Sequence, residues 1–165
     1  MVRMAQRISL GELFSQYGAA LLATARRITG SDADAEEAVA DTFFALLRGK
    51  GQLDPARDPG AYLNRAVVNR SLNQLRRRRR APGPLPESLP SQAAPSDARL
   101  ALLRRGIAAL PARQAEVFTL RHIEGREIAA IARDLAVAPA TVRVHLHQAT
   151  KTLRRRFESK EARRV

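Results

Sequence analysis

Apolar residues recur at helical spacing from the start of the chain. The first stripe lies between Ser9 and Gly30 and consists of Leu10, Leu13, Tyr17, Leu21 and Ile28. Ser9 followed by Glu12 is a capping-box pattern, and glycine is a common helix terminator. The pattern therefore predicts a helix that begins after Ser9 and ends at Gly30.

Two more helices are predicted before residue 81. Ser31 with Asp34 can cap the second, which ends near Gly49, and Asp58 followed by Pro59 opens a third. The apolar stripe of the second holds Ala35, Val39, Phe43 and Leu46, and the third carries Tyr62, Leu63, Ala66, Val67, Leu72 and Leu75. The third helix ends in the arginine run 76–80, which fits a clamp on a nucleic-acid backbone and a solvated helix end equally well.

The second half of the chain follows the same period with shorter elements. Ser96 can cap a helix that carries Leu100, Leu103, Ile107 and Leu110 on one face, and Pro111 opens a helix over 112–122 that Gly125 follows. A short amphipathic helix with Ile128, Ile131, Ala132 and Leu135 comes next. After the turn DLAVAP, a final helix carries Val142, Leu146, Ala149 and Leu153. Two helices joined by so short a turn are typical of a helix-turn-helix.

A proline-rich segment separates the two halves. Residues 81–95 hold five of the nine prolines, no aromatic residue and no helical period, which is typical of a flexible or extended linker. We therefore expect two small helical domains, 1–80 and 96–165, joined by the linker 81–95. No stretch alternates long enough to predict a strand, so the expected fold class is all-α.

The charge of the chain limits the classes of partner that it is expected to bind. Lysine and arginine number 29 against 16 acidic residues, a net charge of +13, which favours nucleic acid or an anionic membrane surface. Cysteine is absent, so thiolate metal sites are excluded. No signal peptide and no apolar run of bilayer length is found, and we expect a soluble, cytoplasmic protein without metal or cofactor.

The final helix is the candidate DNA reader. In a helix-turn-helix the second helix enters the major groove, and its exposed residues near the N-terminus reach the base edges. The predicted contact residues are Pro139, Ala140, Thr141, Arg143, Val144, His147, Gln148 and Lys151. Arg143 can pair with guanine and Val144 can meet a thymine methyl, while Lys151 and the arginines 154–156 suit phosphates. The alternative is an amphipathic helix whose basic face is merely solvated.

The second predicted helix has the opposite charge. Every charged residue between Arg27 and Arg48 is acidic, and these residues are Asp32, Asp34, Glu36, Glu37 and Asp41. Such a face would be repelled by DNA but suits a basic protein partner. Acidic residues in a first helical turn also complement the helix dipole, which explains the first four of them nearly as well.

Taken in order, these segments resemble an extracytoplasmic-function (ECF) sigma factor of the sigma-70 superfamily. SDADAEEAVADTFFALLRG is similar to regions 2.1–2.2, and DPGAYLNRAVVNRSLNQLRRRRR is similar to regions 2.3–2.4. LPARQAEVFTLRHIEG and IARDLAVAPATVRVHLHQATKTLRRRF are similar to region 4. The resemblance implies a three-helix region 2, a region 4 that binds the minus-35 element, and a protein that is not an enzyme. The implied partners are promoter DNA, the β′ clamp helices and β flap of core RNA polymerase, and an anti-sigma factor.

By that resemblance, the acidic residues of the second helix bind the β′ clamp helices, and the third helix with the loop before it captures the minus-10 element. The expected minus-10 residues are Arg57, Tyr62, Asn64, Arg65, Asn69, Arg70 and Asn73, and the loop 51–57 is the expected pocket for a flipped base. The chain departs from the family at several positions. Tyr62 stands where tryptophan is common, Ala129 and Ala130 replace frequent acidic residues, and Val144 with His145 replaces a commoner Ser-Arg pair.

Other functions remain open from the residues alone. A repressor or activator would bind a palindromic operator without polymerase, and would dimerise. A recombinase or nuclease would need a catalytic cluster, but the acidic residues of the second helix do not converge with a candidate nucleophile or base. Docking to an anionic membrane would leave the helix-turn-helix pattern unexplained.

Overall fold

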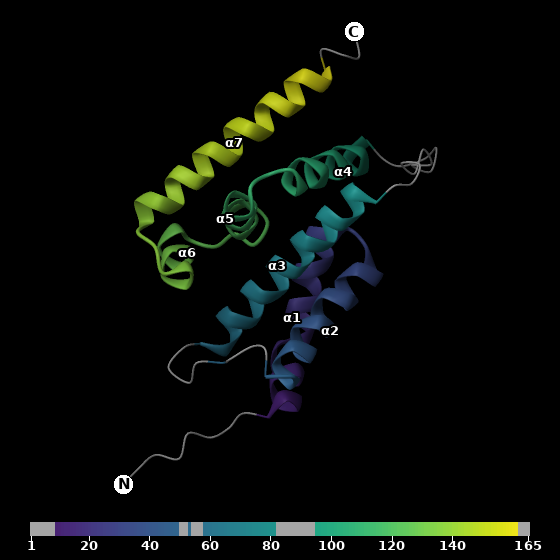
Figure 1. Cartoon of the computed structure of the whole chain (residues 1–165), viewed down its shortest axis with the longest axis vertical. Coiled ribbons are helices and arrows are strands. Elements are labelled where there is room, and N and C mark those ends of the chain that lie inside the picture. Colours follow the sequence, from purple (N-terminus) through teal and green to yellow (C-terminus); the bar gives the residue numbers. More distant parts are fainter. Residues whose placement is uncertain (1–8, 50–52, 54–57, 82–94, 162–165) are drawn as a thin grey trace. The chain divides into compact units, whose positions relative to one another are not determined.

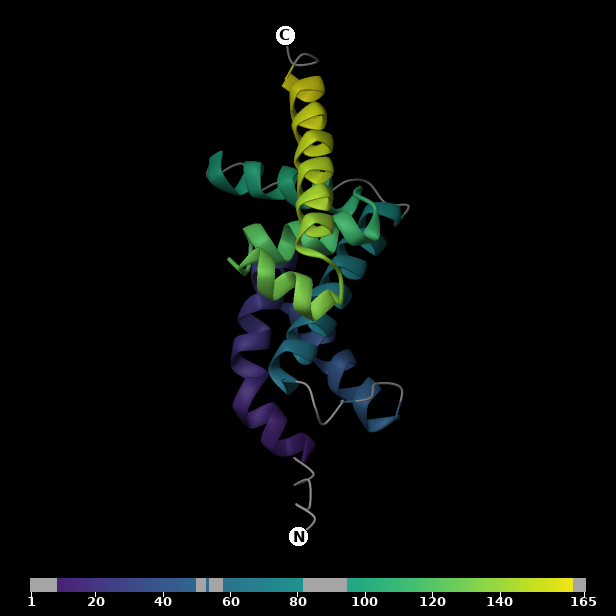
Figure 2. The same ribbon diagram turned by 90° about the vertical axis from the view of Figure 1, so that its left-hand side faces the viewer.

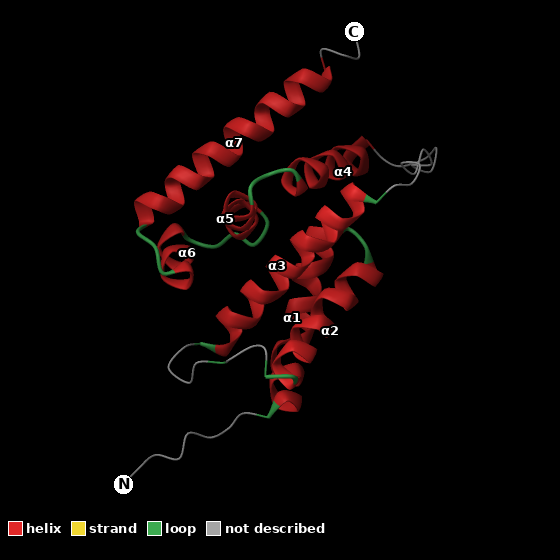
Figure 3. Cartoon of the chain, viewed as in Figure 1, coloured by secondary structure: helices red, strands yellow, loops and turns green. Residues whose placement is uncertain are grey.

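The computed structural model describes residues 9–49, 53, 58–81 and 95–161. Within these ranges every regular element is an α-helix (Figure 3). In chain order they are α1 (Leu10–Thr29), α2 (Asp32–Leu47), α3 (Pro59–Arg80), α4 (Pro95–Ala108), α5 (Ala112–His122), α6 (Ile128–Leu135) and α7 (Pro139–Glu161) (Figure 1). The all-α prediction is therefore confirmed for the described residues.

The chain divides into two compact units, Met1–Ser71 and Leu72–Val165. The division falls within α3, a few residues before the predicted boundary at residue 80. Most of the predicted linker 81–95 lies outside the described residues, so its extended character stays a prediction. No helix among the described residues is long and apolar enough to cross a membrane.

The caps predicted for α1 and α2 are confirmed. The backbone N–H of Glu12 donates to Ser9 Oγ at 3.2 Å, and the Ser9 N–H donates back to Glu12 Oε2 at 2.8 Å. The backbone N–H of Ser9, assisted by the Ser9 hydroxyl, stabilises the charged carboxylate and holds the pKa of Glu12 below its usual value. Gly30 ends α1 with a φ of 68°, a left-handed conformation that glycine adopts without strain. Ser31 then caps α2 by accepting from the N–H of Asp34.

The core of the first unit is built by all three of its helices. Leu13, Leu21 and Ala25 of α1 and Ala35, Ala38, Val39 and Phe43 of α2 meet Leu63 and Val67 of α3. The α1–α2 pair is a helical hairpin with a two-residue connection at Gly30 and Ser31 (Figure 1). Asp58 caps α3 as predicted, because its carboxylate accepts from the N–H groups of Gly60 and Ala61. These contacts fix the positions of α2 and α3 in the first unit.

In the second unit, the sequence prediction needs two corrections at α4. The helix starts at Pro95 and not after Ser96, since proline is well suited to the first helical position, where no N–H is needed. Leu100, predicted on the buried face, is 46% exposed. Close packing of α4 on α7 lies further along, where a Cβ at Gly106 would stand 2.7 Å from Leu153 Cδ2. The C-terminal half of α4 therefore carries this contact.

Helices α5, α6 and α7 close around a second core. Val117 and Leu120 of α5 are buried with Ile131 and Leu135 of α6 and with Val142, Ala149 and Leu153 of α7. Figure 2 shows α7 continuing well beyond the part of its length where α6 lies. One face of α7 is therefore held by the core, and the opposite face is left to solvent.

Candidate functional site

The turn between α6 and α7 has the geometry of a helix-turn-helix. Ala136 ends α6 in the left-handed conformation, with a φ of 53°. The N–H of Val137 donates to the carbonyl of Ala132 at 3.0 Å, and the N–H of Thr141 donates to the carbonyl of Ala138 at the same distance. These bonds satisfy backbone groups at both helix ends, so the turn is rigid. Rigidity matters because the turn sets the angle at which α7 meets a ligand.

The predicted minus-35 residues share the solvent face of α7. Thr141 is half-buried at the start of the helix, and the other seven are exposed: Pro139, Ala140, Arg143, Val144, His147, Gln148 and Lys151. Val144 is 53% exposed, so its methyl groups are accessible for a contact with a thymine methyl. The face thus combines cations, hydrogen-bonding groups and an apolar contact.

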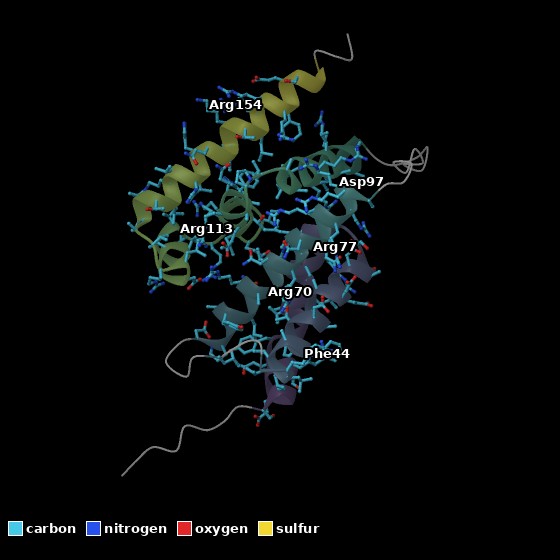
Figure 4. The ribbon with its side chains drawn as sticks, viewed as in Figure 1. Phe44, Arg70, Arg77, Asp97, Arg113 and Arg154 are labelled. Atoms are coloured by element: carbon cyan, nitrogen blue, oxygen red, sulfur yellow. The ribbon has the colours of Figure 1, made fainter. Side chains whose placement is uncertain are left out.

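The cations of α7 are available to a polyanion. Within the described residues, no acidic side chain forms an ion pair with Arg143 or Lys151. The exposed arginines 154–156 continue the positive charge along the helix, and Figure 4 shows Arg154 on α7. A cation without an ion pair can neutralise a phosphate and release counterions without first losing a protein partner.

A salt bridge and a hydrogen bond in the second unit stabilise the segment that leads into the helix-turn-helix. Arg126 Nη2 lies 2.6 Å from Asp134 Oδ2, and both side chains are mostly buried, so this pair ties the segment before α6 to its last turn. Arg121 donates to the carbonyl of Arg126 at 3.0 Å, which links α5 to the same segment. Sequence reasoning missed these supports, because only the fold brings their members together.

A hydrogen bond between two side-chain amides involves one of the exposed residues of α7. Gln114 Nε2 in α5 donates to Gln148 Oε1 in α7 at 3.1 Å. Gln148 was predicted as a reader of DNA, whereas Gln114 carried no signal in the sequence. The predicted DNA-contact face of α7 is therefore partly organised by α5.

Two histidines of the second unit differ in their surroundings. His122 stacks on Phe118 with ring centroids 4.6 Å apart, and burial, assisted by the charge of Arg121, lowers the pKa of His122. His145 is half-buried on α7, and its Nδ1 is buried without a hydrogen-bond partner. His145 is thus less available to DNA than the exposed His147 two residues later.

The predicted minus-10 residues on α3 are less exposed than the face of α7. Tyr62, Asn64, Arg65, Asn69 and Arg70 are half-buried, and only Asn73 is exposed. Arg70 Nε donates to Thr42 Oγ1 of α2 at 3.1 Å, so this cation already has a protein partner (Figure 4). Asn73 accepts from Arg76 Nη1 at 3.0 Å.

The loop before α3 lies mostly outside the described residues. Arg57 and the predicted base pocket over 51–57 fall there, with the exception of Leu53. Leu53 packs partly buried against the core of the first unit. The contact anchors the loop at one point, and the pocket itself stays a prediction.

The acidic residues lie on α2 as expected, and they differ in their surroundings. Asp32 forms a 2.7 Å salt bridge with Arg26 Nε of α1, and Asp34 is half-buried. Glu36, Glu37 and Asp41 are exposed. The salt bridge offsets the charge of Asp32.

An apolar patch follows the acidic residues and was not predicted. Phe44 and Leu47 at the end of α2 are 54% and 64% exposed, and Phe14 of α1 is 57% exposed. Phe14 also stacks edge-on against Phe43, with ring centroids 5.2 Å apart. Large exposed apolar side chains beside charged ones are typical of protein-binding surfaces.

Comparison with known families matches both halves of the chain. Residues 13–81 match the model of Sigma-70 region 2, and residues 100–153 match the model of Sigma-70, region 4.

Three relatives are similar over most of their length. The ECF RNA polymerase sigma factor SigL of Mycobacterium tuberculosis is 31% identical over 150 residues, which cover 86% of this chain and 85% of that protein. SigM of the same species is 29% identical over 151 residues, covering 90% of this chain and 77% of that protein. The RNA polymerase sigma-E factor of Streptomyces coelicolor is 31% identical over 146 residues, covering 86% and 82%.

Two solved structures share the fold. CnrH, in complex with the cytosolic domain of CnrY, has a TM-score of 0.57 at 23% identity and covers 91% of this chain and 88% of its own. The sigma factor RpoE of Bartonella quintana, in complex with the anti-sigma factor NepR, has a TM-score of 0.53 at 19% identity, covering 90% and 96%.

Proposed function

The chain belongs to the ECF RNA polymerase sigma factors of the sigma-70 family, and we propose that it binds core RNA polymerase and selects the promoters at which transcription starts. One observation carries the residue-level assignment. The final helix of the helix-turn-helix presents exposed cations, of which Arg143 and Lys151 form no ion pair with any described residue, while α2 presents exposed carboxylates and apolar side chains. The two surfaces suit two different partners, promoter DNA and a basic protein.

Region 4 is assigned to the minus-35 element. Arg143 is the strongest candidate for a base contact, because arginine donates two parallel hydrogen bonds to guanine in the major groove. Lys151 and the arginines 154–156 are assigned to phosphates, which strengthen binding without selecting a sequence. The other exposed residues of α7 complete this DNA-binding surface. The β flap of polymerase is the second partner assigned to region 4.

Region 2 is assigned to polymerase and to the minus-10 element. The exposed acidic residues of α2, Glu36, Glu37 and Asp41, face the β′ clamp helices, and Phe44 and Leu47 add apolar contact area. Asp32 and Asp34 contribute less, because one is paired with Arg26 and the other is half-buried. The amide and arginine side chains of α3, with Tyr62 and Arg57, hold the unstacked strand of the minus-10 element.

Three further statements belong to the same proposal. The chain supplies recognition, and polymerase performs the chemistry, so the chain itself is not an enzyme. Since transcription takes place on the chromosome, we infer that the chain acts in the cytoplasm. By analogy with CnrH bound to CnrY and RpoE bound to NepR, we infer that an anti-sigma partner controls it. A repressor that acts without polymerase receives no support from relatives that are all sigma factors.

The test of polymerase binding uses a change of charge on α2. Asp41→Arg should weaken binding to core polymerase by about tenfold or more, because a like charge would face a basic partner. Asp97→Arg in α4 is the matched control, since it makes the same change in net charge at an exposed position outside α2. Affinity is measured by titrating labelled chain with core enzyme. Equal affinity of the two variants would overturn the assignment of α2.

A further inference from the structure

One side chain of the DNA-reading face is held in place by the protein before any DNA arrives. Gln148 is exposed on α7, and its Oε1 accepts a hydrogen bond from Gln114 Nε2 at 3.1 Å. Gln114 is half-buried in the first turn of α5. The two residues are 34 positions apart in the sequence, so packing of α5 on α7 creates this contact.

The direction of the bond follows from the surroundings of Gln114. Its Oε1 is buried and has no hydrogen-bond partner. Exchanging oxygen and nitrogen in both amides would let Gln148 donate to Gln114, but it would bury an NH2 group of Gln114 that has two protons to place. Burying an amide NH2 group without a partner costs more free energy than burying a carbonyl oxygen without one, because two donors lose their hydrogen bonds to water. The arrangement with Gln148 Oε1 as the acceptor is therefore favoured.

The consequence concerns what Gln148 can offer to DNA. With Oε1 turned toward Gln114, the NH2 group of Gln148 is the part of the amide left for a ligand. A free glutamine pairs with adenine by accepting from N6 and donating to N7, which requires both ends of the amide. Guanine presents two neighbouring acceptors, O6 and N7, in the major groove and needs donors only.

We propose that Gln114 is a positioning residue that makes Gln148 a hydrogen-bond donor, so that Gln148 selects guanine over adenine at one base pair of the minus-35 element. The proposal rests on the assignment of α7 to promoter DNA and adds a specificity determinant that does not itself touch DNA. Both residues lie on helices fixed by the buried Ala115, Val117 and Ala149, so the amide is held on a rigid support. A side chain ordered in advance loses less entropy when it binds.

The decisive variant is Gln114→Glu. A carboxylate can accept but cannot donate, so Gln148 must turn its NH2 group toward residue 114 and present Oε1 to the DNA. That oxygen accepts from the exocyclic amino group of adenine or cytosine. The preference for guanine at this base pair should therefore shift toward adenine or cytosine by about tenfold in the ratio of selected sequences.

The measurement uses the full chain bound to core polymerase and a promoter pool with a randomised minus-35 block. Selected DNA is sequenced for the wild type and three variants. Gln148→Ala should abolish the preference at one base pair only. Ala112→Glu adds the same charge to the exposed first turn of α5, two residues before Gln114, and should weaken binding to all sequences alike. Retention of the base preference that depends on Arg143 shows that each variant keeps its fold.

The outcomes separate the two levels of the proposal. A shift toward adenine or cytosine in Gln114→Glu, absent from Ala112→Glu and absent when Gln148→Ala is added, supports the positioning role. Unchanged base preferences in Gln148→Ala would overturn it, since Gln148 would then contact only phosphate. A wild-type chain that selects no promoter with polymerase would overturn the proposed function as well.

Discussion

The arginines of α3 and the cations of α7 are used in different ways. On α3, Arg70 donates to Thr42, Arg76 donates to Asn73, and Arg77 donates to Gln74. On α7, Arg143 and Lys151 are exposed and form no ion pair within the described residues. These three arginines of α3 have hydrogen-bond partners within the protein, whereas Arg143 and Lys151 of α7 lie exposed to solvent.

The difference fits the two forms of DNA assigned to these helices. Duplex DNA presents a regular groove, so a fixed face such as that of α7 can read it with little rearrangement. A melted strand is irregular and is held base by base, with side chains that move to meet it. We therefore expect the face of α7 to be ready in the free protein, and the side chains of α3 to exchange protein contacts for DNA contacts.

The largest expected effects come from shortening one buried side chain in the core of each unit, in two separate variants. Ile131 and Leu63 are each fully buried, one in each unit, and replacing either by alanine should lower the free energy of unfolding by about 2–5 kcal/mol. Ile131→Ala should abolish minus-35 recognition and leave core polymerase binding measurable, because α2 keeps its own core. Denaturant unfolding and a polymerase titration test both points. A loss of polymerase binding in Ile131→Ala would show that the units do not act separately.

Next in size is the loss of a single base contact. Arg143→Ala should weaken binding to the preferred promoter by about 1–3 kcal/mol and relax base choice at one position. Lys151→Ala is the control on the same helix, and should weaken binding to all sequences evenly. The slope of log affinity against log salt concentration should fall by about one, because one phosphate contact is lost. Holoenzyme binding is measured at several salt concentrations. Identical behaviour of the two variants would contradict the separation of base readers from phosphate contacts.

A smaller effect is expected where α3 meets α2. Thr42 is buried and accepts from Arg70, so Thr42→Val removes an acceptor and should cost about 1 kcal/mol of stability. If Arg70 exchanges this bond for DNA during opening, Arg70→Ala should slow open-complex formation more than Thr42→Val does. Permanganate footprinting of the melted strand measures this. Equal rates in the wild type and Arg70→Ala would remove Arg70 from the minus-10 surface.

The smallest expected effect concerns pH. Burial holds the pKa of His122 below the usual 6.5, so the unfolded chain takes up the proton first as the pH falls. The contribution of His122 to stability is therefore full above pH 6.5 and is lost as the pH falls below that value toward the folded pKa. His122→Gln should lose less stability than the wild type over this acidic range, as measured by denaturant unfolding. A greater loss in the variant would mean that the pKa of His122 is raised.

Helix ends were the part of the fold best predicted from sequence. Ser9 with Glu12, Ser31, and Asp58 with Pro59 lie beside the backbone groups that they satisfy, so local pattern alone determines them. Burial was predicted less well in α4. Phe43 was correctly placed on the buried stripe of α2, whereas Leu100 was placed on the buried face of α4 and is 46% exposed.

Contacts between distant residues could not be predicted. Gln114 and Gln148 meet because α5 packs on α7, and Arg126 meets Asp134 because α6 folds back on the segment before it. The sequence indicated that α7 reads DNA, since a short turn and a basic face are local properties. It did not indicate which residues hold that face in place, because these belong to other helices.

The most direct test of the whole account is transcription from a pool of random or genomic promoters by core polymerase with this chain. The account predicts transcripts that start downstream of a shared two-block motif, and a strong reduction of these transcripts with Asp41→Arg, which should bind polymerase about tenfold or more weakly. Arg143→Ala should bind polymerase but lose base choice at one position of the upstream block. A chain that binds a palindromic duplex alone and never joins polymerase would contradict the account.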